Sequence, residues 1–271
     1  MIDTHCHLTF PDFAGREAKI MDRARAAGVV GAITVSTTSE NCNDCLALAE
    51  RLESVWCTSG VHPLHTAEDP RDYANLRRVA EHERCVAWGE LGLDRHYDEP
   101  ALEIQREVLA EQLALIESAT DDGLVKPVVV HCRKAVPELI PVLRASRIDP
   151  ARFVFHCFTE APEDARAVLD FGAMISFTGI VTYKNAREVA ESARLVPDDR
   201  IMAETDAPFL PPEPVRGKRP CVPAYAAHTA RFLAELRGTA WGEFERIIDE
   251  NTERFFGIPV SRLGAAEGST A

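Results

Sequence analysis

Short apolar runs rich in β-branched residues recur along the chain, each followed by a turn of polar residues, glycine or proline. A segment with apolar residues three and four positions apart then leads to the next run. This alternation predicts a parallel sheet, because parallel strands must be joined by crossovers, which are usually helices. We count eight predicted strands: Ile2 to Leu8, Gly31 to Thr37, Val55 to Val61, Cys85 to Leu93, Pro127 to Cys132, Phe153 to Phe158, Ala173 to Phe177 and Ile201 to Asp206.

The segments between the predicted strands have the spacing of amphipathic helices. Arg16 to Ala27 and Leu102 to Ser118 are clear examples, and Trp241 to Phe256 predicts a last helix with one apolar face. Eight strands alternating with helices, without a low-complexity linker, favour one closed barrel over two domains. We therefore predict an α/β fold, a single TIM (β/α)8 barrel with a C-terminal helix, over residues 1–258. Residues 259–271 are predicted to form a flexible tail.

The composition, 46% hydrophobic and 27% charged over 271 residues, is typical of a globular protein with a large core. The chain opens without the basic and apolar regions of a signal peptide. Its apolar runs are far shorter than the roughly 20 residues that cross a bilayer. We expect a cytoplasmic protein that does not interact with a membrane and has no obligate protein partner.

Eight cysteines are scattered along the chain, which favours reduced thiols over a disulfide framework. Cys42 and Cys45 form one C-x-x-C pair, but no second pair accompanies it, so packing is favoured over zinc or redox chemistry. The net charge of −13 argues against a broad basic surface for nucleic acid. A polyanionic substrate must therefore be held locally.

Polar residues stand at the C-terminal ends of most of the predicted strands. Because TIM-barrel active sites lie at the C-terminal ends of the strands, these residues are the candidates for function. A lone histidine on a strand is usually a hydrogen-bonded core residue, but a buried cluster without a cation would leave unpaired polar groups at several kcal/mol each. The candidates are His5, His7, His62, Glu90, His131, His156 and Asp206.

A metal centre would remove that cost. His5 and His7 are two positions apart, so both can face the barrel axis while Cys6 faces the helices. Imidazole and carboxylate ligands suit divalent ions such as Zn²⁺ or Mn²⁺, and six ligands with one bridging carboxylate would serve two ions. The predicted division assigns His5, His7 and Asp206 to one ion, His131 and His156 to the other, and Glu90 to both.

Two ions close together would lower the pKa of a shared water and stabilise developing charge, so the predicted reaction class is metal-assisted hydrolysis. Glu204 and Asp3 are candidates to orient a ligand histidine, or else simply fill the barrel. Arg133 lies two residues after His131, on the same face, where a guanidinium can bind phosphate through two hydrogen bonds.

A short basic loop follows the last predicted strand. It contains Arg216, Lys218 and Arg219 against one acid, Glu213, in an otherwise acidic protein. Its position just beyond Asp206 favours electrostatic steering of phosphate, with an ordinary solvated loop as the alternative.

Six segments of the chain resemble those of TatD-type metal-dependent deoxyribonucleases, a branch of the amidohydrolase superfamily. They occur in the family's order and, with Arg216 to Arg219 and Asn251-Thr252, extend the resemblance from about residue 1 to residue 257. The turn after His62 departs from the family pattern, since it has Pro63-Leu64-His65 where Pro-His is more usual. The six segments are Asp3 to His7, Gly60 to Pro63, Gly89 to Asp94, Pro127 to Arg133, Phe155 to Phe158 and Glu204 to Leu210.

The resemblance implies phosphodiester hydrolysis of DNA by two divalent ions (Mg²⁺, Mn²⁺ or Zn²⁺), often by exonuclease action from a free 3′ end on single strands. It implies that His62 and Arg133 contact the substrate phosphate. We expect the water that bridges the metals to be the nucleophile and Asp206 to pass its proton to the leaving oxygen, with Glu90 as the other catalytic residue. By motif position, the resemblance assigns metal binding to His5, His7, Glu90, His131, His156 and Asp206.

Two other functions remain open at this point. The same barrel and metals could hydrolyse a small ester, amide or phosphoester, because one fold supports many reactions. Relatives of that kind often bridge their metals with a carboxylated lysine, whereas this chain offers Glu90 on the fourth strand. A metal-binding or partner-binding protein without catalysis is the third reading.

Overall fold

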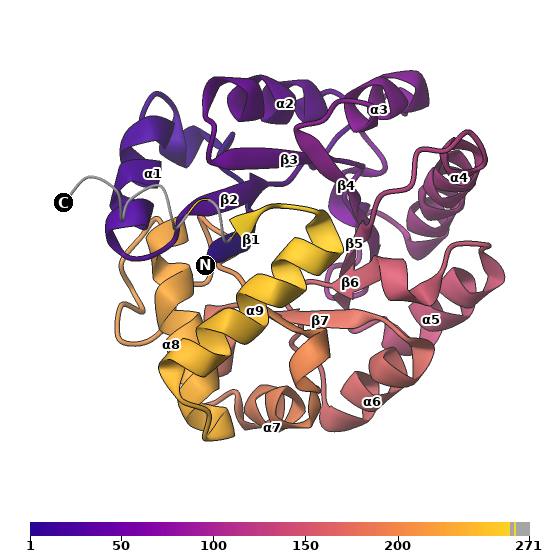
Figure 1. Cartoon of the computed structure of the whole chain (residues 1–271). Coiled ribbons are helices and arrows are strands. Elements are labelled where there is room, and N and C mark those ends of the chain that lie inside the picture. The colour runs from indigo at the N-terminus through magenta and orange to yellow at the C-terminus, as the bar shows by residue number, and fades with distance from the viewer. Residues whose placement is uncertain (261–262, 264–271) are drawn as a thin grey trace.

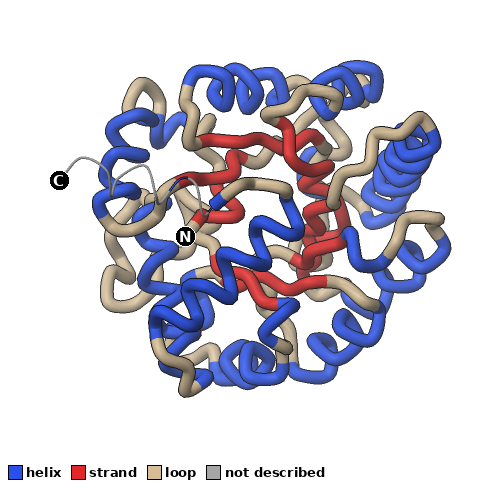
Figure 2. Tube along the Cα trace, viewed as in Figure 1, coloured by secondary structure: helices blue, strands red, loops and turns tan. Residues whose placement is uncertain are grey.

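The computed structural model describes residues 1–260 and residue 263; the rest of the predicted tail, 261–262 and 264–271, lies outside the described residues. Within this part of the chain, parallel strands form one sheet in sequential order, β1 to β8, which curls into a barrel surrounded by helices (Figures 1 and 2). The predicted TIM barrel is confirmed. The strands are β1 (Ile2–Cys6), β2 (Gly31–Thr34), β3 (Val55–Ser59), β4 (Cys85–Asp94), β5 (Val128–Arg133), β6 (Phe153–Phe155), β7 (Met174–Phe177) and β8 (Ile201–Ala203).

Helices follow the strands and cover the outside of the barrel, and the last one crosses an end of it (Figure 1). No helix among the described residues is long and apolar enough to cross a membrane. The helices are α1 (Glu17–Ala26), α2 (Asn41–Arg51), α3 (Tyr73–Ala80), α4 (Leu102–Asp121), α5 (Val136–Ala145), α6 (Pro162–Phe171), α7 (Arg187–Leu195), α8 (Ala226–Arg237) and α9 (Trp241–Phe256).

Several strands end two or three residues earlier than the sequence pattern predicts. The predicted first strand ran to Leu8 but β1 ends at Cys6, and the predicted last strand ran to Asp206 but β8 ends at Ala203. The polar residues there leave the ladder because their side chains converge on the barrel axis. His7, His156 and Asp206 therefore lie just beyond strands rather than within them.

The barrel closes between its first and last strands through contacts beyond the strand ends. Cys6 and Ala207 form an isolated parallel bridge. The amide of Asp206 donates to His5 O at 2.9 Å, and the amide of His7 donates to Ala207 O at 2.7 Å. The closure thus lies at the same end of the barrel as the candidate site.

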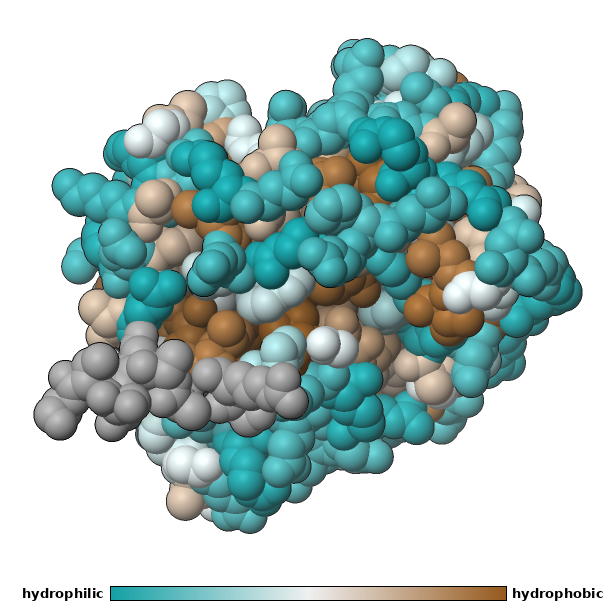
Figure 3. Space-filling view, turned by 45° about the horizontal axis from the view of Figure 1, so that its top comes forward, coloured by the Kyte–Doolittle hydropathy of each residue, from teal (hydrophilic) through white to brown (hydrophobic). Residues whose placement is uncertain are grey.

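Two apolar clusters hold the barrel together. The larger one fills the space between strands and helices. The smaller one fills the N-terminal end of the barrel interior, where Phe256, Ile258 and Val260 pack against strand residues such as Trp56. Val260, which the sequence analysis placed in the tail, is 3% exposed and belongs to this second cluster. Most of the outer surface on this side is hydrophilic, with hydrophobic residues in recesses (Figure 3).

Arginines link the N-terminal ends of neighbouring strands. Arg84, Arg152 and Arg200 each stand immediately before an even-numbered strand. Each guanidinium donates to backbone carbonyls at the start of the preceding strand, for example from Arg84 to Glu53 O at 2.7 Å and from Arg200 to Gly172 O at 2.7 Å. These bonds satisfy carbonyls that the strand ladders leave unpaired, and unpaired buried groups are costly.

We predict that Arg84→Met lowers the free energy of unfolding by about 1–3 kcal/mol, because it removes donors to several carbonyls and the stacking of Arg84 on Trp56 at 4.9 Å. Urea unfolding followed by circular dichroism measures this. The control is Arg166→Met, which removes only an exposed contact with Glu163 and should change stability by less than about 0.5 kcal/mol. Equal shifts for the two variants would contradict the linking role.

Candidate metal centre

A cavity of about 570 Å³ opens at the C-terminal end of the barrel, where the sequence analysis placed the site. Almost all of the predicted site residues contribute to its lining. His5 is the exception: it is fully buried and lies beneath the others. The predicted residues that line the cavity are His7, His62, Glu90, His131, Arg133, His156 and Asp206.

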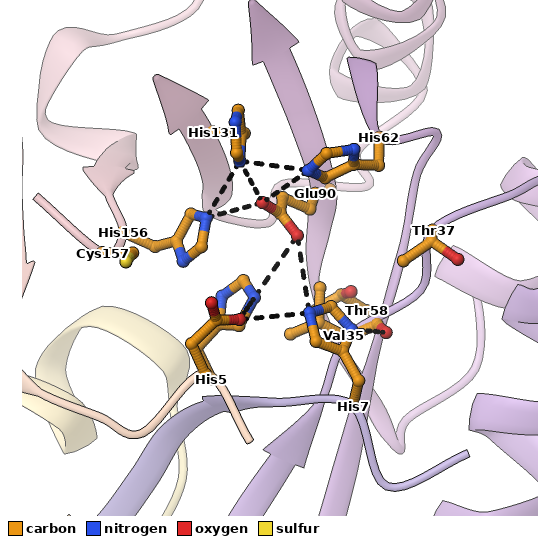
Figure 4. Close-up of polar contacts among 12 residues, drawn as sticks. His5, His7, Val35, Thr37, Thr58, His62, Glu90, His131, His156 and Cys157 are labelled. Atoms are coloured by element: carbon orange, nitrogen blue, oxygen red, sulfur yellow. Dashed lines mark hydrogen bonds and ion pairs between the residues drawn. The ribbon is translucent and has the colours of Figure 1, made fainter. Parts of the chain in front are cut away.

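Glu90 occupies the middle of this cluster, and its two oxygens face different sets of imidazoles (Figure 4). Oε1 lies 2.5 Å from His156 Nε2 and 2.8 Å from His131 Nδ1. Oε2 lies 3.3 Å from His5 Nε2 and 3.9 Å from His7 Nε2. The carboxylate thus joins two groups of nitrogen atoms, which come from the end of β1 on one side and from the ends of β5 and β6 on the other.

Asp206 completes the group around β1. Its Oδ1 lies 3.3 Å from His7 Nε2 and 3.8 Å from His5 Nε2. Three sets of residues have ligand atoms that all lie within 4.8 Å of one another and could hold a metal ion. They are His5, His7 and Asp206; His5, His156 and Glu204; and His62, Glu90 and His131.

The outer nitrogens of two imidazoles are hydrogen-bonded, and the outer nitrogen of a third faces a carboxylate. His131 donates from Nε2 to Asp94 Oδ2 at 2.9 Å, and His7 donates from Nδ1 to Val35 O at 3.1 Å. His156 Nδ1 lies 3.3 Å from Glu204 Oε1. In a neutral ring, a proton held by these outer partners leaves a lone pair on the inner nitrogen, directed at a carboxylate.

A lone pair facing a carboxylate oxygen at 2.5–3.3 Å is repulsive unless a metal ion or a second proton on the ring lies between them. His5 Nε2 and Glu90 Oε2 are moreover buried without a hydrogen-bond partner among the described residues. Buried polar atoms in this state cost about 1–3 kcal/mol each. Nitrogen and carboxylate donors around such atoms fit divalent metal ions.

The electrostatics of the cluster also favour positive charge at its centre. Burial raises the pKa of Glu90, but His156, His62 and His5 outweigh it and hold that pKa well below its usual range. Burial likewise opposes ionisation of Asp206, and the hydrogen bond with His7 outweighs it and lowers the pKa. Both carboxylates are therefore ionised and available to a cation.

His62 differs from the other histidines. Its Nδ1 accepts a hydrogen bond from Leu64 N at 3.0 Å, and burial holds the pKa of the ring well below its usual range. The neutral ring therefore carries its proton on Nε2, which points at the cluster, 3.1 Å from His131 Nδ1. This nitrogen is a donor, and a donor suits an incoming oxygen better than a metal.

Glu204 and Asp3 have different surroundings. Glu204 Oε1 faces His156 and also accepts from Cys157 N at 2.6 Å, which agrees with an orienting role. Asp3 touches no imidazole among the described residues; its carboxylate accepts from Thr205 N and Oγ1 at 2.9 and 2.6 Å. Of the two roles left open for Asp3, the structure therefore favours the one that does not involve a histidine. Asp3 fixes the segment that places Asp206 at a φ of 59°, a left-handed conformation that needs such support.

Two glutamines and two glycines place β4 and its neighbours. Gln112 on α4 accepts from Val61 N at 2.8 Å and donates to Val61 O at 3.1 Å, next to His62. Gln105 makes the same pair of bonds with Asp94, at 2.8 and 3.0 Å. A Cβ on Gly92 would lie 1.9 Å from His131 O and one on Gly89 2.4 Å from Val129 O, so only glycine allows the approach of β4 to β5 there.

The mouth of the cavity combines cations with aromatic rings. Arg133 stacks on Tyr97, with 5.6 Å from its Cζ to the ring centroid, and both line the cavity. Tyr97 is 52% exposed and Phe209, on the opposite loop, is 43% exposed. His65 also lines the mouth, beside His62.

The basic loop after β8 contributes fewer cations to the cavity than its sequence predicts. Of its three cations, only Arg219 lines the cavity. Arg216 stacks on Tyr183 at 3.9 Å and lies 3.8 Å from Glu213 Oε1. Steering of phosphate would therefore depend on Arg219, together with Arg133.

Sequence reasoning missed several of these residues. Asp94 could have been found, because it lies four positions after Glu90 on the same strand face. Tyr97 and the two glutamines had no comparable signal, since their roles arise from loop and helix packing. Cys42 and Cys45 are buried on α2, and burial raises the pKa of both thiols to about 12, so they are packing residues.

Comparison with known proteins identifies the family. The family described as TatD related DNase matches residues 2–257. The chain is 37% identical over 266 residues to the uncharacterized metal-dependent hydrolase YcfH of Escherichia coli K12, covering 97% of this chain and 98% of that protein. It is 34% identical to the 3′-5′ ssDNA/RNA exonuclease TatD of Pantoea ananatis, over 95% of this chain and 100% of that one.

The fold agrees with the sequence comparison. The crystal structure of YJJV, a TatD homolog from Escherichia coli K12, superimposes with a TM-score of 0.87 at 33% identity, and covers 96% of this chain and 98% of that chain. The family match, over residues 2–257, spans the whole barrel. The protein is a metal-dependent hydrolase that belongs to the TatD related DNase family.

Proposed function

We propose that this protein hydrolyses phosphodiester bonds of single-stranded DNA from a free 3′ end, with two divalent ions (Mg²⁺, Mn²⁺ or Zn²⁺) at the candidate centre. The observation that carries the proposal is the position of Glu90. Each of its oxygens faces a separate group of nitrogen donors, which is the arrangement expected of a carboxylate shared by two ions. A 34% identical relative named as a 3′-5′ ssDNA/RNA exonuclease supports the choice of substrate.

The ligands in this proposal are those predicted from the sequence. His5, His7 and Asp206 would hold one ion, His131 and His156 the other, and Glu90 both. Bound there, the ions would lower the pKa of water and stabilise the negative charge that develops on the phosphorus oxygens.

The protein's own groups account for the proton and the phosphate. Asp206 lines the cavity and is ionised, so it can accept the proton of the attacking water and pass it to the leaving oxygen. His62 presents an N–H to the centre, and Arg133 presents a guanidinium at the mouth; both can bind the non-bridging oxygens.

A preference for single-stranded DNA would come from aromatic residues at the mouth of the cavity. Tyr97 and Phe209 are the two aromatic residues among the four large hydrophobic residues that are exposed in the described chain, and both line this cavity. Unstacked bases bind to such rings, whereas bases within a duplex are not available. Other aromatic residues near strand ends are not available for stacking, because Phe158 and Phe177 are buried and Tyr183 is covered by Arg216.

The direct test uses the full-length protein, stripped by chelation and reloaded with Mg²⁺, Mn²⁺ or Zn²⁺. We predict that linear single-stranded DNA labelled at its 5′ end shortens stepwise from the 3′ end, that circular single-stranded DNA resists, and that chelation abolishes turnover. Glu90→Gln should lower kcat at least about a hundredfold and reduce the metal content, because it removes the charge of the shared ligand.

The matched control is Glu163→Gln, an exposed carboxylate on α6 that should leave kcat and metal content unchanged. Hydrolysis of small esters or amides without any cleavage of DNA would overturn the proposal in favour of a small-molecule hydrolase. Full activity of Glu90→Gln would show that the carboxylate is not shared by the ions.

We predict that Tyr97→Ser and Phe209→Ser each raise KM for single-stranded DNA by roughly tenfold, since stacking on one aromatic ring stabilises a base by about 1–3 kcal/mol. Neither variant should change kcat/KM for methyl p-nitrophenyl phosphate by a comparable factor. Leu195→Ser, which replaces an exposed residue outside the cavity, is the control and should leave both substrates unaffected. Unchanged KM for DNA in both aromatic variants would refute the stacking role.

A further inference from the structure

A second cavity, of about 390 Å³, lies at the opposite end of the barrel from the metal centre. It is formed by the segments that lead into β5, β6, β7 and β8, together with the last turns of α9, the helix that crosses this end in Figure 1. The TatD reaction proposed above makes no use of this end. The residues around it nevertheless have a consistent chemistry.

Four cations line this cavity in a protein whose net charge is −13. Asp199 is the only acidic residue in the lining, and its backbone carbonyl, rather than its carboxylate, accepts a hydrogen bond from Arg254. The cations come from four separate segments of the chain. They are Lys126, Arg152, Arg200 and Arg254.

The four cations are held in place by neutral groups. Lys126 Nζ donates to His82 O at 2.9 Å, Arg152 Nε to Lys126 O at 3.0 Å, and Arg200 Nη1 to Gly172 O at 2.7 Å. Arg254 Nη2 donates to Asn251 Oδ1 at 2.8 Å. Carbonyl and amide oxygens orient a cation but do not cancel its charge.

No carboxylate of the described chain lies within ion-pair distance of any of these four side chains, in contrast to arginines elsewhere on the surface. Arg246, also on α9, pairs with Glu250 at 2.7 Å, and Arg77 pairs with Glu81 and Asp122 at 3.0 and 2.8 Å. Burial lowers the pKa of Arg152 and outweighs the opposing effect of the Asp149 charge. The cavity therefore keeps a concentrated positive potential.

The remaining wall of the cavity is apolar. Val125 is 62% exposed, the largest exposed fraction among the exposed large hydrophobic residues of the described chain, and Phe255 and Pro127 lie in the same lining. A bare anion would leave this wall in water. A ligand with both an anionic group and a flat organic part would use the cations and the wall together, and a volume near 390 Å³ is within the range of small-molecule sites.

We propose that this basic cavity is a binding site for a small phosphate-bearing ligand of the nucleoside monophosphate class. The phosphoryl group binds the guanidinium groups of Arg200 and Arg254, which suit phosphate geometry, and the organic part lies against Val125 and Phe255. The site stands on its own residues and does not depend on the function proposed for the metal centre.

The test uses the full-length, metal-loaded protein, with inorganic phosphate and adenosine 5′-monophosphate as separate probes. Calorimetric titration gives affinity, and hydrogen exchange with mass spectrometry gives location. Both probes should protect the backbone of residues 125–127 and 199–200, and the nucleotide should bind more tightly than phosphate. Arg254→Gln should weaken this binding by roughly tenfold, since a hydrogen bond to a charged group contributes about 1.5–3 kcal/mol.

The matched control is Arg246→Gln, which removes the same charge from the same helix outside the cavity and should bind both probes as the unmodified protein does. Arg254→Lys keeps the charge and should recover part of the affinity. Such a recovery would show that the affinity lost in Arg254→Gln reflects the missing binding group rather than misfolding. Phe255→Ala should weaken the nucleotide but not inorganic phosphate. Protection confined to the metal centre, or equal weakening by Arg246→Gln, would overturn the proposal.

Discussion

The burial of one carboxylate among imidazoles is the constraint on which the rest of this structure depends. Glu90 is 1% exposed and lies within 3.9 Å of nitrogen atoms from four other segments of the chain. Such a group is tolerable only if positive charge is supplied to it and if the strands around it cannot move apart. Glycines that let β4 approach β5, glutamines that fix the ends of β3 and β4, and outer carboxylates that turn the imidazoles inward all serve these two conditions.

Much of this arrangement could be predicted from the sequence because it follows from periodicity. The alternation of apolar runs and amphipathic segments gave the barrel, and Trp241–Phe256 was predicted with its observed bounds. The rule that barrel sites lie at strand ends brought His5, Glu90, His131 and Asp206 together without any knowledge of distances. Several strand ends were placed two or three residues too late, because the sequence does not show where the ladder of hydrogen bonds stops.

The parts that could not be predicted depend on packing between distant segments. Nothing in the pattern of α4 indicates that Gln105 and Gln112 bind backbone beside the site, since a buried glutamine has no periodic signal. The sequence left open whether Asp3 orients a histidine or fills the barrel, and only the structure shows that its carboxylate turns to Thr205 across the seam of the barrel. Whether an aromatic residue is exposed, as Phe209 is and Phe158 is not, is likewise decided by the tertiary structure.

The seam between β1 and β8 has a consequence for synthesis. The strands that close the barrel are the first and last of the series, and they meet through Cys6 and Ala207 in the midst of the candidate ligands His5, His7 and Asp206. During translation, the first two of these emerge about two hundred residues before the third. An incomplete chain on the ribosome therefore has the early histidines but not the residue opposite them, so the centre can form only once nearly the whole barrel has been made.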